Sequence, residues 1–167
     1  MLRLLKSWLP VVLWMGFIFA MSTGLGSFEH TSRFIVPLLH WLLPTAAPET
    51  LGLIHFMIRK AGHFTEYAIL ALLTLRAAGP PPVPGQAAQA LRMAAVAFLV
   101  ASAYAATDEL HQVFVPGRTA SLGDVLIDMS GASAAVSSAT LWRWWRTRKN
   151  AAIPANRLQS TGGQLSS

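Results

Sequence analysis

The chain has 167 residues, a length typical of a single domain. Hydrophobic residues make up 53% of it and charged residues only 12%, against about 25% charged residues in ordinary soluble domains. The net charge of +6 does not indicate a nucleic-acid partner, because the basic residues lie at the ends of apolar segments. The absence of cysteine excludes a disulfide framework and a thiolate metal site. The composition therefore predicts an integral membrane protein whose principal partner is the lipid bilayer.

Four apolar segments predict transmembrane helices, at about 8–23, 54–76, 91–115 and 122–145. A further apolar piece at 34–43 is broken by Pro37 and ends at Pro44, so it is too short to cross a bilayer, which takes about 20 residues. We expect it to form an interfacial or re-entrant segment in the first external loop. Pro48 and Glu49 predict a helix start, and this helix could continue into the second span.

The predicted fold is all-α: residues 1–149 form one four-span membrane bundle, and the polar segment 150–167 is a disordered cytoplasmic tail. The orientation follows from the distribution of Lys and Arg. One side of the predicted topology holds nine of them: Arg3, Lys6, Arg76, Arg92, Arg143, Arg146, Arg148, Lys149 and Arg157. The other side holds four: Arg33, Arg59, Lys60 and Arg118. This ratio predicts that both termini are cytoplasmic.

Ionisable side chains inside the predicted spans are the candidates for function, because each is costly in hydrocarbon. With the adjoining arginine they are His63, Glu66, Asp108, Glu109, His111, Arg118, Asp124 and Asp128. The second, third and fourth predicted spans carry the ionisable residues. A rise of about 1.5 Å per helical residue places these residues in the outer half of the membrane. Spacings of three and four residues also put them on common helix faces. On the last span the acidic face is shared with small residues, which allow close helix packing in a bilayer.

Three motifs and one serine in this pattern resemble the VanZ-like family of bacterial membrane proteins. The motifs are Lys60-Ala-Gly-His63-Phe-Thr-Glu66-Tyr67, Asp108-Glu109-Leu-His111-Gln112-Val-Phe-Val-Pro116-Gly117-Arg118 and Asp124-x-x-x-Asp128-x-x-Gly131, and the serine is Ser22. The resemblance implies a multi-pass protein of the bacterial cytoplasmic (inner) membrane that serves the cell envelope. The name-giving member confers resistance to teicoplanin, a glycopeptide antibiotic with a lipid tail. Lower susceptibility to such antibiotics, with a lipid-tailed or lipid-linked ligand, is therefore the expected function.

The residues themselves leave three interpretations of the polar cluster open. The first is a metal site, for which His63, Glu66, Asp108 and His111 are the candidate ligands. The second is a membrane hydrolase or transferase that acts on a lipid-linked envelope intermediate, with a carboxylate or histidine for proton transfer and Arg118 for a phosphate. The chain has no nucleophile elbow, P-loop or lipid phosphatase motif. The sequence thus decides neither whether the protein is an enzyme nor which cofactor it binds.

The third interpretation is purely structural. Arg118 and Lys60 would pair with Asp108, Glu109 or Asp124 and so fasten the helices together. In this interpretation Ser121 and Asp124 form a capping box that opens the last helix. Pro116-Gly117 would form a type II turn.

Overall fold

The computed structural model describes residues 2–23, 27–80, 85–116, 118 and 120–151. The described residues are all-α, as predicted, with no strand among them. The helices are α1 (Leu2–Ser22), α2 (Phe28–Leu42), α3 (Pro48–Ala77), α4 (Ala87–Gln112) and α5 (Leu122–Ala151). The predicted tail from 152 onwards lies outside the described residues.

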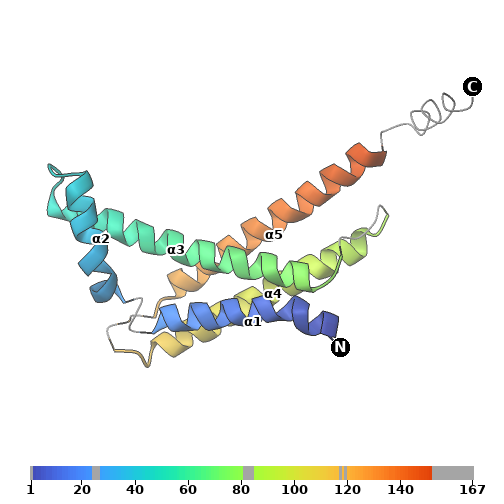
Figure 1. The fold of residues 1–167 in the computed structure, drawn as a ribbon, viewed down its shortest axis with the longest axis horizontal. Helices are drawn as coiled ribbons and strands as arrows, with labels where there is room; N and C mark the ends of the chain where they lie inside the picture. The colour runs from blue at the N-terminus through green and yellow to red at the C-terminus, as the bar shows by residue number, and fades with distance from the viewer. Residues whose placement is uncertain (1, 24–26, 81–84, 117, 119, 152–167) are drawn as a thin grey trace, which may run out of the picture.

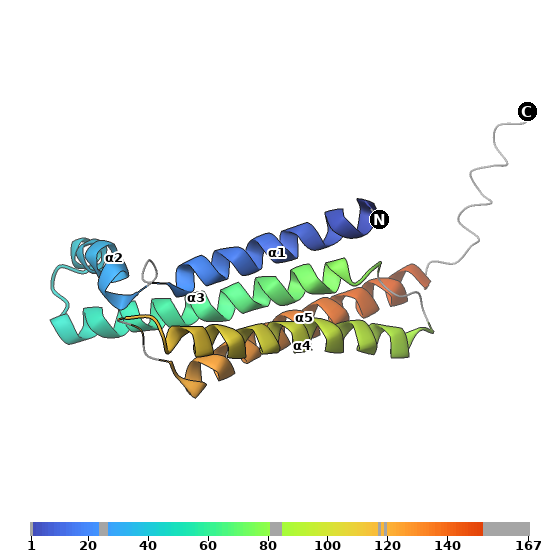
Figure 2. The same ribbon diagram turned by 90° about the horizontal axis from the view of Figure 1, so that it is seen from below.

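The four long helices run up and down in turn, and α2 crosses one end of them (Figures 1 and 2). Figure 2 shows the starts of α1 and α4 and the far ends of α3 and α5 together at one end of the bundle. The end of α1, the short helix α2 and the α4–α5 connection lie at the other end. This is the alternating arrangement that four successive spans require.

Local sequence signals account for the start of α3 and the end of α4. Helix α3 begins at Pro48, with Glu49 in its first turn, and continues without a break to Ala77, as predicted. Helix α4 ends at Gln112, three residues before the predicted end of its span. The reason is Pro116, because its ring disfavours helical geometry at the preceding residue. The chain then forms a turn, in which the backbone N–H of Phe114 donates to the carbonyl of His111 and that of Val115 donates to the carbonyl of Gln112.

The core of the bundle joins large side chains of α1 and α3 to small side chains of α4 and α5. Val11, Ile18, Tyr67, Leu70 and Leu75 pack against Ala97, Ala101, Ala105, Ala132 and Val136. Alanine at every fourth position of α4 keeps that face flat, so neighbouring helices can approach it closely.

Helices α3 and α5 approach each other closely at Gly131. A Cβ atom built at Gly131 would overlap the carbonyl oxygen of Phe64 and would lie 2.9 Å from its carbonyl carbon. Only a residue without a side chain therefore fits at this position. The acidic face of α5 is its packed face, as the small residues around Asp124 and Asp128 predicted.

The segment predicted to be interfacial or re-entrant forms α2, which is longer than the apolar piece alone. Ser27 caps it, because its side-chain oxygen accepts a hydrogen bond from the backbone N–H of His30 at 3.3 Å. Phe34 and Trp41 remain 78% and 77% exposed on its outer face. On the inner face, Thr31 lies 3.1 Å from His55, a fully buried residue of α3.

Two of the helices, α1 and α4, are long and apolar enough to cross a membrane on length and composition. Among the described residues, the stretches are Leu4–Ser22 and Ala87–Gln112. Two such helices suggest a membrane protein.

Candidate functional site

Buried polar side chains gather at the end of the bundle where α1 and α4 end and α5 begins (Figure 2). The buried members are Ser22, Asp108, Glu109, Gln112, Asp124 and Asp128. His63 adds a side chain that is 11% exposed. The helices that the sequence predicted to contribute, α3, α4 and α5, therefore do bring their ionisable groups together, and α1 joins them through Ser22.

Asp108 is held by a small hydrogen-bond network between α1 and α4. Ser22 donates to its Oδ2 atom at 2.6 Å, and Gln112 Nε2 donates to the same oxygen at 3.1 Å. Gln112 also lies 3.4 Å from the Ser22 hydroxyl. Gln112 was not among the residues predicted to have a role, although its position four residues after Asp108 places the two on one helix face.

Two contacts fasten the start of α5. Lys60 of α3 forms an ion pair with Asp124, one of the pairs that the structural interpretation predicted. Ser121 donates its backbone N–H to Glu109 Oε2 at 2.8 Å, and its hydroxyl accepts from Gly123 N–H at 3.1 Å. Glu109, rather than Asp124, therefore takes the acidic position of the predicted capping box. The reason is that Asp124 is turned to the cation of α3.

A group of three potential ligands forms where α3, α4 and α5 meet. One atom each of His63, Glu109 and Asp128 lies within 4.8 Å of the other two. His63 Nδ1 is 3.4 Å from Asp128 Oδ1. Asp128 is fully buried, and within the described residues neither of its oxygens has a hydrogen-bond partner. The same is true of Glu109 Oε1.

Arg118 is oriented by main-chain carbonyls, not by a carboxylate as predicted. It donates to the carbonyl oxygens of Met21 and, at 3.3 Å, Thr23, at the end of α1. Across the described ranges no carboxylate lies within ion-pairing distance of it. The carbonyls left free at a helix end are good acceptors for a guanidinium, which explains the preference. Its backbone N–H donates to Val115 at 3.2 Å and closes a turn, but Gly117 lies outside the described residues, so no turn type is assigned.

A cavity of about 200 Å³ lies beside the cluster and is lined from α1, α2, α3 and, through Arg118, the segment between α4 and α5. Its polar lining includes Ser22, Arg59, His63, Glu66 and Arg118. Burial lowers the pKa of Arg118, and the nearby charge of Arg59 lowers it further. An arginine nevertheless stays protonated in a protein. The cavity therefore presents positive charge beside a histidine and a carboxylate.

The metal candidates from the sequence are placed differently from one another. His63 belongs to the group of three, and Glu66 lines the cavity. Asp108 is bonded to Ser22 of α1, and His111 stacks on Phe19 of α1 with ring centroids 4.6 Å apart. Neighbouring residues of a helix point about 100° apart. When Asp108 faces α1, Glu109 therefore faces α3 and α5.

A comparison with protein families matches the VanZ/LLP1 model to residues 7–143, which contain all of these residues. The chain belongs to the VanZ/LLP1 family. The resemblance drawn from the three motifs is thus confirmed, and the apolar helices α1 and α4 agree with a membrane location. No curated protein and no solved structure gave a match.

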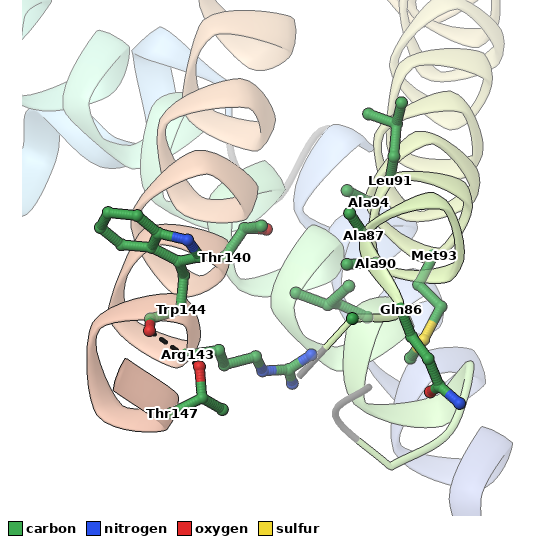
Figure 3. A pocket seen from close by; sticks show the side chains of 12 residues that line it. Gln86, Ala87, Ala90, Leu91, Met93, Ala94, Thr140, Arg143, Trp144 and Thr147 are labelled. Carbon is green, nitrogen blue, oxygen red and sulfur yellow. Dashed lines mark hydrogen bonds between the residues drawn. The ribbon is translucent and has the colours of Figure 1, made fainter. Parts of the chain in front are cut away.

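This VanZ/LLP1 protein has a second, larger pocket of about 370 Å³ at the opposite end of the bundle (Figure 3). Its walls are mainly apolar side chains of α4 and the far half of α5, such as Leu91, Met93 and Trp144. Figure 3 shows Arg143 reaching from α5 into the space beside α4. Among the described residues that line this pocket there is no histidine or carboxylate, and the ionisable residues of the three motifs lie at the other end of the bundle.

Proposed function

We propose that this VanZ/LLP1 protein is a four-span protein of the bacterial cytoplasmic membrane, with both termini in the cytoplasm. Exposure of its apolar side chains supports this proposal. Only 11% of the apolar stretch of α1 and 28% of that of α4 is buried inside the bundle. Leu126 and Leu141 of α5 are 65% and 64% exposed. A core helix of a soluble protein hides such side chains, whereas lipid covers them in a membrane.

In the membrane the protein lowers susceptibility to lipid-tailed glycopeptide antibiotics such as teicoplanin. Family membership supports this role, and the observation that carries the site is the cavity of about 200 Å³ beside the polar cluster. The cavity is lined by the polar side chains of Arg118, His63 and Glu66 and by the apolar side chains of Ile35 and Ile58. A ligand with a polar head and an acyl tail matches such a surface, because the head can meet the charges while the tail stays in lipid.

A membrane enzyme acting on a lipid-linked envelope intermediate is the second candidate. One observation favours it: His63 lies 3.4 Å from the buried carboxylate of Asp128 and also lines the cavity. A histidine oriented by a carboxylate is the usual arrangement of a general base, and an arginine nearby can hold a phosphate. In this alternative the same cavity would hold the substrate during hydrolysis or group transfer.

Paired measurements on one set of variants test the proposed function. Cells that express the wild type, Glu66→Gln or Asp108→Asn are compared for teicoplanin susceptibility, and the purified proteins for thermal unfolding in detergent. We expect both variants to remain folded and to lose the resistance phenotype, because each keeps its shape while losing one charge. If susceptibility changes only in variants that are also destabilised, the polar cluster has a structural role and is not a functional site.

Two controls sharpen this experiment. Glu49→Gln removes an exposed carboxylate at the start of α3, far along that helix from His63, and should leave resistance unchanged. A glycopeptide without a lipid tail should show no difference between wild type and variants. A third measurement tests the enzyme. If membranes with the wild type consume a lipid-linked precursor and membranes with the His63→Gln variant do not, the enzyme is favoured instead.

A further inference from the structure

We infer that His63, Glu109 and Asp128 bind one divalent transition-metal ion, with zinc as the metal that the ligand set suits best. The three side chains come from α3, α4 and α5, and their ligand atoms lie within 4.8 Å of one another. Two atoms that are each about 2.0–2.2 Å from one ion lie no more than about 4.4 Å apart, so binding would draw the three side chains slightly closer together. One imidazole nitrogen and two carboxylate oxygens also match the ligand types that zinc accepts.

Hydrogen bonding gives an independent reason to place a cation at this point. Asp128 is fully buried, yet within the described part of the chain neither carboxylate oxygen has a hydrogen-bond partner. Glu109 is 4% exposed and uses only Oε2, for Ser121, which leaves Oε1 without a partner there. Buried polar atoms are nearly always satisfied in native proteins. A cation between these oxygens would satisfy them.

The charges around the group are consistent with a bound dication. Asp124, one turn before Asp128 on α5, is already paired with Lys60. Asp108, next to Glu109 on α4, is bonded to Ser22 and Gln112. Glu109 and Asp128, the two carboxylates of the group, carry a formal charge of −2 when ionised, which one divalent ion would balance. Buried carboxylates this close together need a compensating cation, whether a metal ion or a protonated His63.

The site has three protein ligands and an adjacent opening. His63 is shared between the group of three and the cavity of about 200 Å³, so an ion could enter from there. Three protein ligands with a fourth position open to water are the arrangement of catalytic zinc sites, whereas structural sites have four. One of the three ligands already has an outer partner that fixes it, because the backbone N–H of Ser121 donates to Glu109 Oε2.

Metal content of the purified full-length protein tests the inference. Protein in detergent is stripped with a chelator, loaded with Zn²⁺, desalted and measured by plasma mass spectrometry. We expect about one zinc per wild-type chain, a higher unfolding temperature with zinc, and loss of both in Asp128→Asn and Glu109→Gln. Glu109→Gln keeps an oxygen for Ser121, so it should stay folded even if Asp128→Asn does not.

Glu66→Gln serves as the matched control. Glu66 lies one turn after His63 on α3 and lines the same cavity, but it does not belong to the group of three. This variant should retain about one zinc. A folded wild-type chain that keeps no more zinc than Glu109→Gln would overturn the inference. The zinc measurement uses neither cells nor antibiotic, so a negative result would not count against the proposed function, which the susceptibility test decides separately.

Discussion

The backbone N–H of Ser121 donates to Oε2 of Glu109 at 2.8 Å and so ties the first turn of α5 to the last turn of α4. The two residues lie 12 positions apart, on either side of the Pro116 turn. A buried carboxylate from one helix therefore satisfies a main-chain donor that the next helix cannot satisfy itself. One of the two contacts that fasten the start of α5 therefore comes from a residue of the proposed metal site.

Replacing Glu109 separates its capping role from its charge. Glu109→Ala removes the acceptor of the Ser121 N–H and should lower stability by about 0.5–1.5 kcal/mol, the net contribution of a typical hydrogen bond, because Ser121 is exposed and water can take the place of the acceptor. Glu109→Gln keeps an acceptor oxygen and should lose less than half of that amount. Thermal unfolding of both variants in detergent, without added metal, measures the difference. Equal losses would mean that the charge of Glu109, rather than the hydrogen bond, stabilises the α4–α5 connection.

The contact between Gly131 and Phe64 makes a second prediction. Gly131→Ala should destabilise the protein by about 1–3 kcal/mol, because the added methyl overlaps the main chain of α3 and the helices must separate. Gly16→Ala in α1 is the control, since a Cβ at Gly16 has no other atom within 4 Å. The control should be neutral or slightly stabilising, because alanine favours a helix over glycine. Thermal unfolding in detergent measures the stability of the two variants. Equal losses of stability would contradict the close packing of α3 against α5.

The ion pair between Lys60 and Asp124 can be tested with a double-mutant cycle. Lys60→Met leaves the carboxylate of Asp124 buried and unpaired, and should cost about 3 kcal/mol, the lower end of the range for a buried pair. Adding Asp124→Asn removes the isolated charge and should restore much of that stability. Strictly additive losses, measured by thermal unfolding in detergent, would show that the two side chains do not interact in solution.

The proposed topology makes a prediction that is independent of the site. Reporter fusions after residue 85 and at the C-terminus should both report the cytoplasm, and a fusion within residues 26–50 should report the exterior. The reason is the excess of Lys and Arg near the termini and the α3–α4 connection. An exterior signal after residue 85 would exclude the four-span arrangement, whatever the outcome of the other experiments.

Much of this protein could be predicted from its sequence, because helices and their apolar faces are local properties of the chain. Pro48 and Glu49 set the start of α3, and the small residues beside Asp124 and Asp128 predicted the packed face of α5. The convergence of polar residues at one end of the bundle also followed from their positions along the helices. These features depend only on spacing, hydropathy and the residues at helix ends.

Only the tertiary structure decided which partner each polar group meets. Adjacent residues such as Asp108 and Glu109 point about 100° apart on a helix, and spacing alone does not say which of them faces α1 and which faces α3 and α5. The rotation of α4 about its own axis directs Asp108 to Ser22, which donates a hydrogen bond to it, and places Glu109 beside His63 and Asp128. Arg118 lies beyond the helix, where no periodicity applies, and the carbonyls at the end of α1 determined its orientation.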